Sequence, residues 1–312
     1  ENWMNARALG MGDAYMSTVE DATATIVNPA ALDKVRGMHF TLTSAGIGTD
    51  TLNPATLQNL AGNNFAAVIQ NYFGQVVNAS VAGYLGFSMR GLGVLGYDYS
   101  TLTFDLHNPS YPNISMNVTN DLGLAVGFGL SLAANDAVRF GLTGKRITRY
   151  GGRVPFGPSI LSSLSNAQLM ALVNNVGYGY GADASFMVEL PGPAHFSFSG
   201  IWSNMGQLTL QPAGGTSIPP ALENDPSIGF GSLFDLPGVK INTSLEYHHI
   251  YLWNEQAGKK LHLGVEFNLP LLSIRGGLNQ GYWTLGAGFD VGFLRIDAAT
   301  YGVEMDTYPG QH

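Results

Sequence analysis

Apolar and polar residues alternate along most of this chain, and the alternation is clearest in its last third. In residues 239–247, 261–269 and 272–279, apolar side chains alternate with polar or charged ones. Successive side chains of a β-strand point to opposite faces, so a period of two predicts strands. The predicted strands cover residues 37–45, 76–90, 92–106, 113–132, 138–150, 178–190, 195–211, 227–234, 239–252, 259–269, 272–279, 283–292 and 293–301.

Two stretches, residues 53–73 and 159–176, replace this period with helical spacing. Neither stretch carries a charged residue, although a soluble surface helix normally has charges on its polar face. Extended apolar surfaces usually mark interaction sites, so we expect both helices to contact acyl chains or a neighbouring subunit. An alternative is that they pack on each other and only cover one end of the fold. The expected contact residues are Leu57, Leu60, Phe65, Val68, Leu161, Leu164 and Leu172.

Composition narrows the fold class. Charged residues make up 12% of the chain, about half the usual share of globular domains. Its apolar runs are shorter than the ~20 residues of a transmembrane helix, which leaves a closed β-barrel as the membrane architecture. A one-sided soluble sheet also alternates, but this chain has too little helix to cover the apolar face of such a sheet. Tryptophans near predicted strand ends also favour a membrane barrel, namely Trp202, Trp253 and Trp283.

We therefore predict an all-β fold, a transmembrane antiparallel β-barrel of about 14 strands with its apolar face in lipid and its polar face in the lumen. The segments identified above are odd in number, whereas bacterial barrels usually have an even number of strands. Either the last strand is missing or two strands have been merged, and we place the merged pair within residues 92–132.

The first part of the chain does not alternate. Residues 7–32 read RALGMGDAYMSTVEDATATIVNPAAL. The order G-M-G-x-A-Y, D-A and N-P-A-x-L resembles the N-terminal plug of FadL/PorV-like outer-membrane β-barrels, and residues 261–304 resemble the C-terminal strands of PorV-like and TraF-like members. An ordinary N-terminal helix with a glycine-rich cap is the alternative. The expected plug residues are Arg7, Gly10, Gly12, Asp13, Glu20, Asp21, Asn28 and Pro29.

The resemblance implies a plug over residues 1–36 inside a barrel over residues 37–312, in the bacterial outer membrane. In FadL-like relatives, helices of the long outer loops form a hydrophobic capture site, whereas PorV-like relatives are partners of secretion machinery. The first hypothesis is therefore binding of membrane lipids or another hydrophobic ligand, with or without transport. The alternatives are a structural or assembly protein whose loop helices contact subunits or a secretion partner, and an open porin. A homo-oligomer is compatible with either of the first two.

Charges on the predicted inward face have both signs. A lumen lined by one sign would indicate an ion-selective pore, whereas mixed signs favour a network that holds the plug. A gating latch that opens when ligand arrives is the functional alternative. The predicted network contains Arg90, Arg139, Lys145, Asp183, Lys240, Glu246, His262, Glu266, Arg275, Asp290, Arg295 and Asp297.

Other chemistry has weaker support. A net charge of −8 gives no nucleic-acid footprint, and the absence of cysteine removes disulfides and thiolate metal sites. Ser244, Glu246 and His262 can be drawn as a hydrolase triad, but no nucleophile elbow accompanies them, so we predict no enzymatic activity. His248 and His249 are neighbours on a strand and point to opposite faces, so they predict neither a metal site nor a cofactor. The alternation slips there, which indicates a β-bulge.

Overall fold

The computed structural model describes residues 5–49, 76–107, 113–132, 136–156, 175–215 and 217–302. The predicted helical stretch 53–73 lies outside these residues, and so does the stretch 159–176 apart from Asn175 and Val176, the second of which begins a strand. Also outside the described residues are the predicted lipid or partner contacts Leu57, Leu60, Phe65, Val68, Leu161, Leu164 and Leu172. Within the described residues, no helix is long and apolar enough to cross a membrane.

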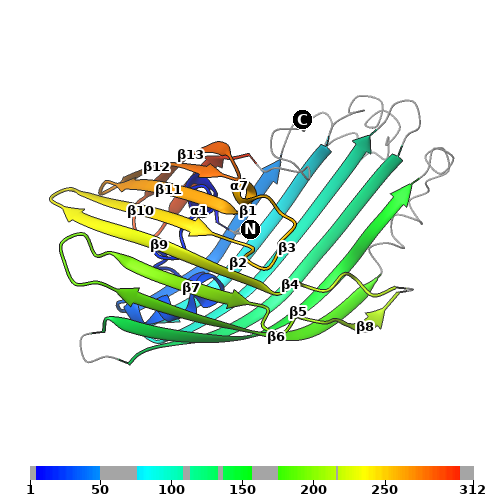
Figure 1. Cartoon of the computed structure of the whole chain (residues 1–312), viewed down its shortest axis with the longest axis horizontal. Coiled ribbons are helices and arrows are strands. Elements are labelled where there is room, and N and C mark those ends of the chain that lie inside the picture. Colours follow the sequence, from blue (N-terminus) through cyan, green and yellow to red (C-terminus); the bar gives the residue numbers. More distant parts are fainter. Residues whose placement is uncertain are drawn as a thin grey trace.

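The described strands form one 14-stranded antiparallel sheet, in which hydrogen-bonded neighbours follow the order of the chain (Figure 1). Only β8 lies off this order, because it pairs with β6. β1 and β14 are the two ends of the order, and no pairing joins them within the described residues. The strands are β1 (Met38–Thr49), β2 (Val76–Met89), β3 (Leu92–His107), β4 (Asn113–Ser131), β5 (Val138–Phe156), β6 (Val176–Glu189), β7 (Ser197–Ser203), β8 (Gln211–Gly214), β9 (Asp225–Leu236), β10 (Val239–Tyr247), β11 (Leu261–Asn268), β12 (Leu272–Asn279), β13 (Tyr282–Asp290) and β14 (Arg295–Thr300).

Two details differ from the expected strands. The single strand expected over 195–211 is β7 followed by a turn, and β8 begins only at Gln211. Asn204 and Gln207, with φ of 52° and 66°, end the extended backbone there. No merged pair lies within 92–132, which holds β3 and β4 as two separate strands, and the additional strand is β8, which lies off the order of the sheet. The bulge expected at His248 is also wrong, because β10 pairs with β11 without a register shift and ends at Tyr247, before His249 turns to a φ of 53°.

Burial alternates along the strands in the sense opposite to that of a soluble sheet. In β11, Leu263 and Phe267 are 39% and 44% exposed, whereas His262 and Glu266 are at most 1% exposed. The predicted alternation is confirmed, with apolar side chains outside and polar side chains inside. Further exposed apolar residues on the strands are Val81, Leu85, Leu122, Leu124, Phe128, Leu142, Ile274 and Leu285.

The polar face of the sheet surrounds the N-terminal segment, which we define as residues 5–35. It contains α1 (Ala6–Gly10), α2 (Ala24–Val27) and the 3-10 helix η1 (Pro29–Lys34). α1 packs on β12, β13 and β14, whereas η1 packs on β2 to β6, so the sheet curves around the segment (Figure 1). The main apolar core is formed mostly by this segment, with Met11, Tyr15 and Leu32 fully buried, and it is completed by Met187 of β6 and Ile201 of β7. A further short helix, α7 (Ala257–Lys260), precedes β11.

Glycines allow the segment to approach the sheet backbone. At Gly12, which has a φ of 67°, a Cβ atom would lie 2.4 Å from the carbonyl oxygen of Leu263. At Gly277 in β12, a Cβ atom would lie 2.5 Å from the backbone nitrogen of Gly12. No other residue type fits either position, because the contacting atoms are backbone. The G-M-G motif is thus a site of backbone-to-backbone contact.

Candidate functional site

The contact between the N-terminal segment and the polar face of the sheet is the candidate site, and Glu266 of β11 is its most connected carboxylate. Arg7 binds it in bidentate fashion, with Nε donating to Oε1 at 2.9 Å and Nη2 to Oε2 at 2.6 Å. Arg275 donates from Nε to Oε1 at 2.7 Å, and Asn242 donates to Oε2 at 2.8 Å. Arg275 also reaches Asp297 at 2.6 Å. This cluster ties α1 to three neighbouring strands.

The charges of this cluster are buried, so they are stable only while they remain paired. Glu266 is fully buried, and Arg7 and Arg275 are 6% and 1% exposed. Burial opposes the charge of Arg7, but the charge and hydrogen bonds of Glu266 outweigh it, so the pKa of the guanidinium lies above its ordinary value. Within the segment, burial raises the pKa of Tyr15 well above its ordinary value, which keeps its hydroxyl neutral beside Arg7.

A second contact centres on Glu246 of β10. Its Oε1 accepts hydrogen bonds from the backbone nitrogen of Met16 at 2.5 Å and from Ser244 Oγ at 2.9 Å, and its Oε2 accepts one from His248 Nε2 at 2.8 Å. The Ser244 hydroxyl therefore donates to a carboxylate and not to His262, so the order of a hydrolase triad is not formed. Burial opposes protonation of His248, but Glu246 outweighs it and raises the pKa of His248.

Hydroxyl groups of the sheet bind the backbone of the segment at several further points. Thr284 donates to the carbonyl of Gly10 at 3.1 Å, and Ser185 accepts from the backbone nitrogen of Ala30 at 2.8 Å. Thr143 donates to the carbonyl of Thr25. Short irregular helices leave backbone groups without intrahelical partners, and these hydroxyls satisfy them.

Charged residues of η1 form a third contact, in which Arg90 and Arg139 of the predicted network meet a partner that was not among the predicted residues. Asp33 lies 3.4 Å from Arg139 and 3.2 Å from Arg90, and Lys34 lies 3.3 Å from Glu189. Asp33 and Lys34 directly follow the N-P-A-x-L motif. Their place next to this motif was the sequence signal that could have identified them as contact residues.

Several other residues of the predicted network and plug do not join the Glu266 and Glu246 clusters. Lys145 pairs with Asp183 inside the sheet at 2.7 Å. Arg90 lies in the β2–β3 turn, where its 60% exposed side chain pairs with Asp33 of η1 and with Asp136, and Lys240 pairs with Asp235 on the surface. Three other charges stay local: Arg295 pairs with Asp297, Asp290 binds the backbone of Gly292, and Asp21 binds Thr23. The remaining residues of the expected plug differ in burial: Glu20 is exposed, whereas Asn28 and Pro29 are buried.

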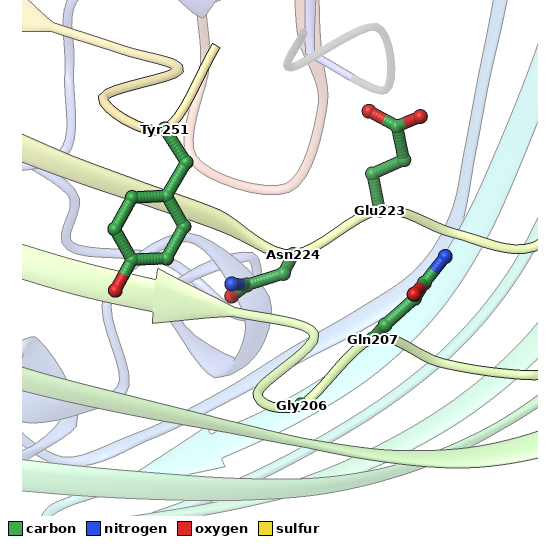
Figure 2. Close-up of a pocket in the computed structure, with 5 residues that line it drawn as sticks. All are labelled: Gly206, Gln207, Glu223, Asn224 and Tyr251. Atoms are coloured by element: carbon green, nitrogen blue, oxygen red, sulfur yellow. The ribbon is translucent and has the colours of Figure 1, made fainter. Parts of the chain in front are cut away.

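A pocket opens at one end of the sheet, where the turn after β7, the stretch before β9 and the loop after β10 meet (Figure 2). It is lined by Gly206, Gln207, Glu223, Asn224 and Tyr251. The Asn224 amide oxygen accepts a hydrogen bond from Trp202. Its lining combines the polar side chains of Gln207, Glu223 and Asn224 with the aromatic ring of Tyr251.

No protein-family model matches the chain, and no curated protein matches it in sequence. Among solved structures, the chain is similar to the crystal structure of a Pseudomonas aeruginosa FadL homologue, with 11% sequence identity and a TM-score of 0.32 over 95% of each chain.

Proposed function

We propose that this chain is a bacterial outer-membrane β-barrel of about 14 strands that is plugged by its N-terminal segment. The barrel binds lipids or other hydrophobic molecules at the helices of its long loops. The observation that carries the proposal is the inverted burial of the strands. A sheet that exposes leucine and phenylalanine while burying arginine and glutamate is favourable when its outer face meets hydrocarbon.

The barrel is proposed to be closed for the same reason, namely that its outer face would meet hydrocarbon and not water. β1 and β14 are the ends of the sheet order. In a bilayer, the unpaired backbone groups of such edges would each cost several kcal/mol. Pairing of β1 with β14 removes both edges, and the curvature of the sheet around the N-terminal segment supports it (Figure 1).

The buried ionic contacts support a plug. Arg7 pairs with Glu266 in a site closed to solvent, and Met16 and Gly12 contact neighbouring strands through their backbones. We expect the intact protein to show no stable large openings in planar bilayers, and we expect conductance to appear when residues 1–35 are deleted. Large stable openings of the intact chain would contradict the plug.

Lipid binding is proposed from the uncharged stretches 53–73 and 159–176. Replacing Leu60 and Val68 together with aspartate places two charges on the apolar side of the first stretch, and we expect lipid to be lost from the protein purified in mild detergent. Native mass spectrometry, with separate analysis of the released lipids, measures this loss.

The control adds the same charge to the opposite, polar face of the same predicted helix, through Asn59→Asp with Asn63→Asp, and should retain lipid. Unchanged lipid in the Leu60→Asp, Val68→Asp variant would contradict the proposal. If that variant instead changes its oligomer size on a column while it keeps its lipid, the stretch is an assembly surface for subunits or a secretion partner.

A further inference from the structure

We infer that Asp13, His248 and His262 form a binding site for a divalent transition-metal ion between the N-terminal segment and the sheet. One carboxylate oxygen and one ring nitrogen from each histidine lie within 4.8 Å of one another. The three residues are 1%, 8% and 1% exposed. This inference is independent of the proposed lipid binding, because it concerns the opposite face of the strands from the one that meets lipid.

His262 presents a buried nitrogen without a hydrogen-bond partner. Its Nδ1 lies 2.9 Å from the carbonyl oxygen of Gly12, so Nδ1 carries the hydrogen and donates it. Nε2 then holds a lone pair, and it has no partner in the described structure although it is buried. An unsatisfied buried polar atom of this kind costs about 1–3 kcal/mol. A metal ion would satisfy it.

The surroundings of both histidines match those of metal ligands. Such a histidine almost always donates its other ring N–H to a carbonyl or a carboxylate, which fixes the orientation of the ring. The carbonyl oxygen of Gly12 accepts this hydrogen bond from His262, and Glu246 Oε2 accepts it from His248 at 2.8 Å. Glu246 is itself held by Ser244 and by the backbone of Met16.

The fold brings the three residues together from distant parts of the chain. His262 faces Glu246 in the register of β10 and β11, and His248 follows one residue after β10. The two imidazole rings stack with centroids 4.1 Å apart. Asp13 follows Gly12 at the point where the segment contacts β11 and has a φ of 61°.

The ligand set indicates the class of ion. Two imidazoles and one carboxylate suit zinc and its first-row neighbours, and a fourth position would be left for water. Bonds of about 2.0–2.1 Å place tetrahedral ligand atoms about 3.4 Å apart, so the stacked rings must turn to bring the ligand atoms, which lie within 4.8 Å of one another, onto the ion. The negative charges of Asp13 and Glu246 would balance the ion in this buried site.

The site would fasten the N-terminal segment to the sheet, because Asp13 belongs to the segment, His262 lies on β11 and His248 directly follows β10. The test uses the full chain in detergent, stripped with a chelator and titrated with Zn²⁺ in a calorimeter. We expect one Zn²⁺ per chain and a higher melting temperature with Zn²⁺. His262→Gln and Asp13→Asn should each weaken binding about tenfold or more, whereas His195→Gln and His249→Gln should not.

Co²⁺ gives a second measurement that needs no variant. Bound at a site with two imidazoles and one carboxylate, it should show visible absorption bands of a tetrahedral complex, which an equal amount of Zn²⁺ abolishes. Absence of these bands together with absence of a Zn²⁺ titration would overturn the inference. Equal binding by the intact chain and by a folded His262→Gln variant would also overturn it, because the ion would then lie elsewhere.

Discussion

Replacing Glu266 with alanine is expected to lower the free energy of unfolding by about 3–5 kcal/mol, the usual cost of removing one partner of a buried ion pair. Arg7 and Arg275 would both lose the carboxylate that they share, at 2.6 Å and 2.7 Å, and both are almost fully buried. Arg275 would keep Asp297, whereas Arg7 has no other ion pair among the described residues. The loss of stability should therefore be greatest at α1, which carries Arg7.

Urea unfolding of the protein in detergent micelles, followed by tryptophan fluorescence, measures this change. Asp235→Ala is the matched control, since it removes one carboxylate from an ion pair whose side chains are 58–59% exposed. Exposed pairs contribute about 0–1 kcal/mol. An equal, small effect of both substitutions would mean that water reaches Glu266 and that the segment does not seal the interior.

The strands could be predicted because their signal is local. The alternation in β10, β11 and β12 required only a period of two in the sequence, and the structure reproduces it. The division of 195–211 was missed although a signal was present. Asn204 and Gly206, with φ of 52° and 76°, are residue types that favour the left-handed backbone of a turn. The end of β10 at Tyr247 depends on the left-handed backbone at His249.

The site was harder to predict because its contacts join residues far apart in the chain. Inward positions of Glu246, His262, Glu266 and Arg275 followed from alternation, but the choice of Arg7 as the partner of Glu266 did not. The grouping of Asp13 with His248 and His262 was also missed. His248 was compared only with its sequence neighbour, whereas its spatial neighbour lies on the next strand.

Replacing Gly277 with valine is expected to displace the N-terminal segment from β12. The new Cβ atom would lie 2.5 Å from both the Gly12 nitrogen and the Met11 carbonyl carbon, and these backbone atoms cannot turn aside as a side chain can. Overpacking costs about 1–3 kcal/mol, and this contact falls at the upper end, which corresponds to roughly a hundredfold shift toward the detached segment. Trypsin cleavage after Arg7, which is 6% exposed, reports that shift.

Gly276 provides the control, because it is the preceding residue of the same strand and a Cβ atom there would have no neighbour closer than 3.9 Å. Gly276→Val adds the same β-branched side chain and should leave cleavage after Arg7 at the rate of the unmodified chain. Faster cleavage in both variants would indicate general loosening of β12. Unchanged cleavage in Gly277→Val would mean that Gly12 does not rest against β12, and it would remove the structural reason for the G-M-G motif.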